Sequence, residues 1–335
     1  MITFIHIIIS IILFFLINII GHFAPIDTKY YQITSFLETD EAPAFNFAFR
    51  ILTPVVFIIL LSSVLYHFEQ DHYVRNIYWV SIYYVSFRAI FNIITNRTYL
   101  INWKKQIFYA LCVVGTTYFV YERLIFKKEN LLPDFSNIAN ELWIIILIFI
   151  YNLINNIKIS ESGAENRKLK YIKNALNNIK HRYSNIINSK VSDIRLRQII
   201  YAIIIHESFN RPKIFRILEY IKSKFSSKEV SLGIMQVKSE HAITDSESIE
   251  KGIDIIIKHF ETLKVDFKIE YENEKANEYS LEYLEQDYQA KLIRKYNHCD
   301  DYTYEIKDLA DYINEKFYLA NKDTRNLFLN YISNN

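Results

Sequence analysis

Residues 193–212 read DIRLRQIIYAIIIHESFNRP, and this stretch decides how the C-terminal part of the chain folds. Its isoleucines recur at the three- and four-residue spacing of one helix face: Ile199, Ile200, Ile203 and Ile204. The predicted helix ends near Glu207, and Pro212 suits the first turn of a following helix. Apolar surroundings at a helix end raise the pKa of a carboxyl group, and a general acid must be protonated near neutral pH. Glu207 is therefore the first candidate catalytic residue.

Amphipathic helices account for most of the remaining C-terminal sequence. One apolar stripe at helical spacing comprises Leu169, Ile172, Leu176, Ile179, Tyr183 and Ile186. Thr244 and Glu247 have the spacing of a capping box, which would open another helix. We expect an extra helix at 213–224 and two or three helices between residues 280 and 333. No long stretch alternates with period two, so the sequence predicts an all-α domain.

Two further stretches carry residues that suit a binding site. Gly233 lies inside the apolar run SLGIMQV of residues 231–237, a placement typical of a backbone that needs positive φ or a close approach. In the same run, Gln236 could offer its amide to a sugar or to a catalytic carboxylate. The third stretch begins with Tyr296 and Asn297, which precede a turn-like segment and Tyr304.

In this order, the three stretches resemble motifs of the lysozyme-like superfamily, specifically soluble-type lytic transglycosylases and goose-type lysozymes. In that family a helix ends in Glu-Ser followed by an aromatic residue and a nearby proline. A Gly-aliphatic-Met-Gln motif and a Tyr-Asn turn with a later tyrosine come next. The matching residues here are Glu207, Ser208, Phe209, Pro212, Gly233, Met235, Gln236, Tyr296, Asn297 and Tyr304. The resemblance covers about residues 193–318, and His298 departs from the Gly or Ala that the family commonly has.

The resemblance implies cleavage of peptidoglycan glycan strands between N-acetylmuramic acid and N-acetylglucosamine. Glu207 would protonate the glycosidic oxygen and, in a transglycosylase, would then take a proton from the C6 hydroxyl to give a 1,6-anhydro end. If water is the nucleophile instead, Glu240 and Asp245 are the candidates for a second carboxylate, whereas we expect Glu219 to face solvent. The substrate-binding residues implied are Ser208, Gly233, Met235, Gln236, Tyr296, Asn297 and Tyr304.

The N-terminal part of the sequence is apolar over long runs. Ile2–Ile20 contains no charge and is long enough, at 1.5 Å per residue, to cross about 30 Å of hydrocarbon. It lacks a cleavage site, so we interpret it as an uncleaved anchor. Four further candidate spans are Ile51–Phe68, Ile77–Thr95, Ile107–Tyr121 and Leu142–Ile157. The third of the five carries Arg88, which we expect to snorkel or to pair inside the bundle.

Charge is divided unevenly along the chain, although its total is only +2. Residues 1–158 hold 11 basic and 10 acidic side chains, against 28 and 27 in residues 159–335. The sequence thus predicts a transmembrane bundle of about five helices over 1–158, an amphipathic connecting helix over 159–192 and a lysozyme-like domain over 193–335. Residues 166–238 carry a net charge of +12, which could attract an anionic polymer or lipid surface, or be neutralised by residues 239–335 at −9.

Other chemistries find little support in the sequence. His206-Glu207 begins like a zinc-protease helix, but Asn210 occupies the position of the second ligand. His298 and Cys299 are adjacent, and neighbours rarely aim at one another as nucleophile and base. We therefore expect no metal, no other cofactor and no nucleic-acid partner.

Two functions remain open at this level. The first is a membrane-anchored peptidoglycan-cleaving enzyme, a lytic transglycosylase or muramidase-type glycosidase, in the bacterial cytoplasmic (inner) membrane. Its C-terminal domain would lie outside that membrane, and its partners would be glycan strands, the lipid bilayer and proteins that contact the bundle. The alternative is a non-enzymatic membrane effector or sensor with a degenerate lysozyme-like domain. Loop charges do not decide the topology, and the basic segment after the fifth span favours a cytoplasmic domain.

Overall fold

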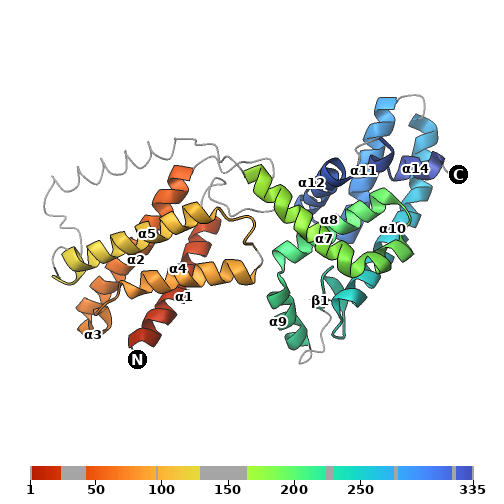
Figure 1. Ribbon diagram of the computed structural model, residues 1–335. Coiled ribbons are helices and arrows are strands. Elements are labelled where there is room, and N and C mark those ends of the chain that lie inside the picture. Colours follow the sequence, from red (N-terminus) through yellow and green to blue (C-terminus); the bar gives the residue numbers. More distant parts are fainter. Residues whose placement is uncertain are drawn as a thin grey trace. The chain divides into compact units, whose positions relative to one another are not determined.

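The chain forms two compact units that divide between Lys168 and Leu169 in a computed structural model (Figure 1). The structure describes residues 2–23, 43–95, 97–128, 164–223, 230–274, 278–318 and 322–333. The domain boundary expected at residue 158 lies outside these residues. Most of the described residues are helical, in agreement with the helical periodicity of the sequence.

The first unit is built from helices of very different lengths. They are α1 (Ile2–Phe23), α2 (Pro43–His67), α3 (Asp71–Val74), α4 (Trp79–Ile94), α5 (Trp103–Val120) and a π-helix, η2 (Tyr121–Ile125). Helix α1 packs along α4, and α2 packs along α5. Apolar side chains fill the space between them, including Leu13, Phe14, Ile58, Val80 and Ile125. Large apolar side chains also stay exposed on this unit, among them Phe4, Leu60 and Leu111.

Among the described residues, no helix combines the length and the apolar character that crossing a lipid bilayer requires. The predicted transmembrane bundle over residues 1–158 is therefore wrong, and the predicted multi-pass position in a bacterial inner membrane loses its basis. Helix α4 illustrates the reason, because its 16 residues rise only about 24 Å against about 30 Å of hydrocarbon. The fifth candidate span, residues 142–157, lies outside the described part of the chain.

Arg88 is buried within the first unit, with 7% of its surface exposed. Its Nη1 donates a hydrogen bond of 2.8 Å to the hydroxyl of Tyr84, one helical turn earlier on α4. A buried guanidinium needs such partners because its desolvation is costly. Arg88 thus pairs inside the unit, one of the two arrangements that we expected for it.

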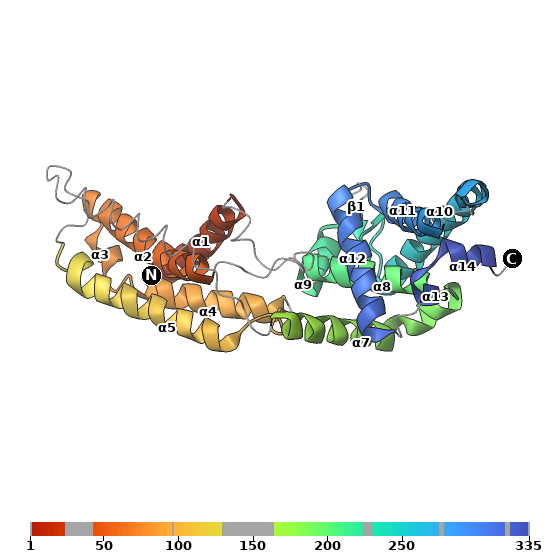
Figure 2. The same cartoon turned by 90° about the horizontal axis from the view of Figure 1, so that it is seen from above.

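The second unit contains the helices that form the candidate site. The unit begins within α7 (Ala164–Lys190) and continues with α8 (Ile194–Asn210), α9 (Lys213–Ser223), α10 (Asp245–Glu274), α11 (Glu278–Tyr296), α12 (Asp300–Phe317), α13 (Lys322–Arg325) and α14 (Phe328–Ser333). Asp193 caps α8, because its Oδ1 accepts a hydrogen bond of 2.8 Å from the backbone N–H of Leu196. Most side chains of α8 are buried, and α12 lies beside it (Figure 2). Helix α8 is thus the central helix of this unit.

A short β-hairpin interrupts the helices between α9 and α10. Strands β1 (Val230–Leu232) and β2 (Val237–Ser239) pair antiparallel, with Leu232 opposite Val237. The sequence predicted an all-α domain and missed this hairpin, because strands of three residues are too short to show a period of two. The capping box before α10 is confirmed. The Thr244 N–H donates to Glu247 Oε2 at 2.6 Å, and the Glu247 N–H donates to Thr244 Oγ1 at 3.2 Å.

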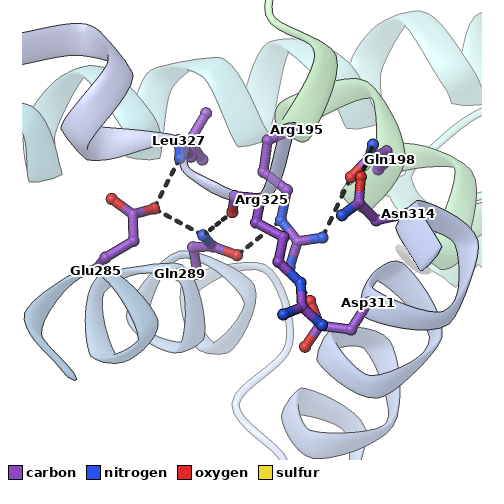
Figure 3. Close-up of polar contacts among 8 residues, drawn as sticks. All are labelled: Arg195, Gln198, Glu285, Gln289, Asp311, Asn314, Arg325 and Leu327. Carbon is purple, nitrogen blue, oxygen red and sulfur yellow. Dashed lines mark hydrogen bonds and ion pairs between the residues drawn. The ribbon is translucent and has the colours of Figure 1, made fainter. Parts of the chain in front are cut away.

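A buried arginine joins three helices of the second unit (Figure 3). The side chain of Arg195 on α8 is completely buried. Its Nε donates to Gln289 Oε1 on α11 at 2.9 Å, and its Nη2 forms an ion pair with Asp311 on α12 at 2.6 Å. Its Nη1 donates to Gln198 Oε1 at 3.2 Å. Since Nε and Nη2 have their partners on two other helices, the network orients α8 against α11 and α12.

The network continues from α11 to the C-terminal helices. Gln289 Nε2 donates to the backbone carbonyl of Arg325 at 2.9 Å and to Glu285 Oε1 at 2.6 Å. The fully buried Glu285 carboxylate accepts hydrogen bonds from the backbone N–H groups of Leu327 and Leu329, at 2.7 and 2.8 Å. A carboxylate at the start of α14 also interacts favourably with the helix dipole. The C-terminal segment is therefore held to the centre of the unit by buried polar contacts.

Candidate functional site

Glu207 lies in the last turn of α8, and its backbone carbonyl accepts the hydrogen bond of 2.7 Å from the Arg211 N–H that ends the helix. Burial raises the pKa of the Glu207 carboxyl group above its usual value of 4.5. His206, Tyr302 and Arg211 partly oppose this shift, while the nearby Glu219 adds to it. The negative end of the helix dipole also disfavours a carboxylate there. Glu207 therefore meets the first physical requirement of a general acid.

Two tyrosines from different elements lie close to Glu207. Tyr296 ends α11, and its hydroxyl donates a hydrogen bond of 2.5 Å to the backbone carbonyl of Met235. Tyr302, in the first turn of α12, is 6% exposed. Burial raises the pKa of both phenols, and the charge of Glu207 raises each of them further. Both tyrosines therefore remain neutral hydrogen-bond donors beside the carboxyl group.

The hairpin turn from Gly233 to Gln236 packs against the start of α10. Gly233 has φ +72°, and a Cβ added there would lie 2.3 Å from Ser248 Cβ. Ser248 Oγ accepts a hydrogen bond of 3.1 Å from the Met235 N–H and donates one of 3.1 Å to the carbonyl of Leu232. Met235 also fills the space beside Gly252, where an added Cβ would lie 2.7 Å from its sulfur. At position 233, glycine is therefore required both by the positive φ and by the close contact with Ser248.

We expect Gly233→Ala to destabilise the second unit by about 2–4 kcal/mol, from the positive φ and the clash together. Urea unfolding of the full chain, with hydrogen exchange of peptides from the hairpin and α10, measures this loss. Gly115→Ala on α5 is the matched control, because apart from its own helix backbone no atom of the described residues lies within 4 Å of the added Cβ. It should be neutral or slightly stabilising. Equal stability of the two variants would contradict the close packing at Gly233.

Three buried polar atoms at this site make no hydrogen bond of ordinary geometry within the described residues. They are Ser208 Oγ, Gln236 Oε1 and Tyr302 Oη. The Tyr302 hydroxyl nevertheless lies near enough to Glu207 to stabilise its carboxylate as a donor. Each unsatisfied buried group costs about 1–3 kcal/mol. A ligand with hydroxyl and amide groups would relieve this cost.

The ring of Tyr302 packs on His206, which in turn contacts the carboxylate of Glu305. Nε2 of His206 lies 2.6 Å from Glu305 Oε2, and Asn210 Nδ2 lies 3.1 Å from the same ring nitrogen. The ring of His206 packs edge-to-face on Tyr302, with ring centroids 5.0 Å apart. These contacts fix the Tyr302 ring beside Glu207.

Glu219 on α9 lies at the site, whereas the sequence led us to expect it to face solvent. Its carboxylate forms an ion pair with Arg211, and its Oε2 is 3.5 Å from Gln236 Nε2. The same Gln236 nitrogen donates a hydrogen bond of 2.9 Å to the carbonyl of Gly233. The expected solvent exposure of Glu219 was wrong because the charged side of α9 faces the rest of the second unit. Glu219 is therefore the carboxylate that acts on Glu207 across the site.

If Glu207 is the acid, Glu219→Gln should move the high-pH limb of the activity profile to lower pH. The negative charge of Glu219 raises the pKa of Glu207, and its removal also leaves Arg211 without that counter-charge. Both changes favour the ionised form of Glu207 and therefore lower its pKa. The pH dependence of glycan cleavage measures the shift, with Asp254→Asn as a control, because Asp254 pairs with Lys190 on the surface. A shift to higher pH would contradict the assigned charge effect.

The structure brings together most of the residues expected at the site, but not all of them. Asn297 Oδ1 accepts a hydrogen bond of 3.2 Å from the Cys299 N–H, so it shapes the turn after α11. Tyr304 is 58% exposed, and Tyr302, two residues earlier, is the tyrosine beside Glu207. Of the two expected second carboxylates, Glu240 is exposed and Asp245 pairs with Arg216 at 3.1 Å.

In the described residues, no group of three or more His, Cys, Asp or Glu side chains is placed to hold a metal ion. No family model, curated protein or solved structure matches the chain. The predicted resemblance to lysozymes and lytic transglycosylases therefore has no support from known relatives. What remains is the geometry around Glu207 and the motifs that led to it.

Proposed function

We propose that the second unit is a glycosidase-type domain that cleaves peptidoglycan glycan strands, with Glu207 as the proton donor. The observation that carries the proposal is the surroundings of Glu207. A carboxyl group with a raised pKa lies among buried polar atoms that lack partners within the described chain. Such atoms suit the hydroxyl and amide groups of an amino sugar.

Cleavage begins when Glu207 gives its proton to the glycosidic oxygen as the bond to the anomeric carbon breaks. Positive charge then develops on the sugar, and the new Glu207 carboxylate stabilises it. Tyr302 stabilises that carboxylate as a hydrogen-bond donor. The carboxylate next takes a proton either from the C6 hydroxyl, which closes a 1,6-anhydro ring, or from a water molecule, which gives a reducing end. In the second case Glu219 is the other carboxylate near the reacting carbon.

The choice of substrate comes from the motif resemblance over residues 193–318. The Glu207-Ser208 pair, the Gly233–Gln236 turn and Tyr296 are separate in sequence, and contacts connect them in space. Tyr296 donates to Met235 within the turn, and the Glu207 charge acts on Tyr296. The proposal concerns the second unit and does not require a membrane anchor.

The test is incubation of the full chain with purified peptidoglycan, followed by mass spectrometry of the released fragments. We expect muropeptides from the wild type and about 10³-fold less product from Glu207→Gln. Anhydro ends would identify a lytic transglycosylase, whereas hydrated reducing ends would identify a hydrolase. If the wild type releases nothing across a range of pH and salt, or if the variant is equally active, the proposal is overturned.

A further inference from the structure

Helix α9 exposes its apolar side and turns its charged side towards the second unit, which is the reverse of an ordinary surface helix. Four aliphatic residues at i, i+3, i+4 and i+7 are 40–56% exposed: Ile214, Ile217, Leu218 and Ile221. The opposite, charged side of the helix contacts the domain. There Arg216 pairs with Asp245, and Glu219 approaches Gln236 at 3.5 Å. An amphipathic helix normally buries its apolar stripe and exposes its charges.

The position of α9 is consistent with an external partner. It lies at the edge of the second unit beside β1 and contacts the first residue of α10, away from α11 and α14 (Figure 1). Helices of 11 residues are marginal in isolation, and α9 gains little from burial of its own apolar side chains. A contiguous exposed apolar stripe of this kind marks an interaction surface.

Charge indicates the kind of partner. Residues 211–223 contain four basic side chains and one acidic one, a net charge of +3. Glu219, the acidic residue, and Arg216 face the domain, whereas Lys213 and Lys222 are exposed beside the apolar stripe. Aliphatic residues flanked by lysines are typical of helices that lie in the plane of an anionic lipid surface.

A second copy of this chain fits the surface less well. Antiparallel pairing of two α9 stripes across a twofold axis would place Lys213 of each copy near Lys222 of the other. Like charges at such a distance repel, and the described residues of α9 supply no exposed acid at the edge of the stripe to offset this. Lipid headgroups with negative charge supply the missing counter-charge.

We propose that α9 is an interfacial helix that adsorbs to anionic lipid surfaces through Ile214, Ile217, Leu218 and Ile221, with Lys213 and Lys222 at the headgroups. Adsorption of an 11-residue helix in the surface plane needs no helix that crosses the bilayer. Because α9 also carries Glu219, adsorption holds the candidate site beside the lipid surface. This inference does not depend on the proposed glycan cleavage.

Hydrogen exchange of the α9 peptide in the full chain tests the proposal, because it reports this helix separately from the rest of the protein. We expect vesicles of phosphatidylcholine with phosphatidylglycerol to slow α9 exchange at least tenfold, and pure phosphatidylcholine vesicles to have little effect. The double variant Ile217→Gln with Leu218→Gln should abolish the slowing. The matched control is Val265→Gln with Ile269→Gln on α10, which are 63% and 62% exposed and should leave it unchanged.

Three results would overturn the proposal. Exchange in α9 could be unaffected by anionic vesicles, or it could slow equally with both kinds of vesicle. It could also slow with rising protein concentration in the absence of lipid, which would identify a second copy as the occupant.

Discussion

Glu207→Gln should lower glycan cleavage by about 10³-fold while leaving the fold intact. Glutamine has the same shape as glutamic acid, so it preserves the packing at the end of α8, but its amide has no proton acidic enough to give to the leaving oxygen. Initial rates of muropeptide release measure the loss. A Glu207→Gln variant that keeps more than a tenth of the activity would remove Glu207 from the role of acid.

The same substitution makes a distinct prediction for stability. Burial raises the pKa of Glu207 above 4.5, so the folded state holds this proton more tightly than the unfolded chain does. The free energy of unfolding therefore falls as pH rises from the unfolded pKa towards the folded one. Glutamine carries no ionisable group there. At pH 7 to 8, Glu207→Gln should thus be as stable as the wild type or more stable, while being inactive.

Activity should also decrease as pH rises through the pKa of Glu207, because only the protonated carboxyl can donate. Tyr302→Phe gives an independent check on this limb. Loss of the phenol removes a donor that stabilises the Glu207 carboxylate, so the pKa of Glu207 should rise and the limb should move to higher pH. Glu219→Gln should move it the opposite way. Opposite shifts from these two variants are not expected from a general loss of structure.

Local sequence patterns predicted the elements of the second unit well. Isoleucine spacing predicted α8, the Thr244 and Glu247 pair predicted the start of α10, and the 213–224 segment corresponds to α9. These features depend on residues within a few positions of one another. Gly233 was also identified, because a glycine in an apolar run signals a special backbone conformation.

Contacts between distant residues were not predictable in the same way. His206 and Glu305 are 99 positions apart, and no local pattern links them. The motif resemblance predicts Tyr304 at the site, but Tyr302 also follows the Tyr-Asn pair. Only the phase of α12 decides which of the two tyrosines faces Glu207. The sequence predicts that Glu219 faces solvent, as a charged residue of an ordinary amphipathic helix would. Its reversed faces could be seen only once the packing of α9 was known.

The N-terminal interpretation failed for a different reason. Long apolar runs were the basis for predicting membrane spans, but such runs also form the packed cores of proteins. Part of these runs is buried inside the first unit, as for Phe14 on α1, whose ring centroid lies 5.0 Å from that of Phe87 on α4. In the described ranges, no helix is long and apolar enough to cross a membrane. Hydropathy alone does not distinguish an isoleucine-rich helix that packs in a protein core from one that crosses a membrane.

Arg195→Met should destabilise the second unit by about 3–5 kcal/mol, the second large effect that we expect. Methionine matches much of the volume of arginine but donates no hydrogen bond. Gln198 Oε1 and Gln289 Oε1 would each lose a donor, and Asp311 would lose its ion-pair partner. Urea unfolding of the full chain, with hydrogen exchange in α8, α11 and α12, separates this loss from events in the first unit.

Arg197→Met, two residues away on the same helix, is the matched control for this prediction. Arg197 contacts Asn188 and the carbonyl of Ser192 at the surface, so its replacement should cost less than about 1 kcal/mol. Because Gln289 also binds the Arg325 carbonyl, Arg195→Met should increase exchange in α13 and α14 as well. Equal effects of the two variants would mean that the buried network does not hold α8 against α11 and α12. A loss confined to α8 would mean that the network ends there and does not reach the C-terminal helices.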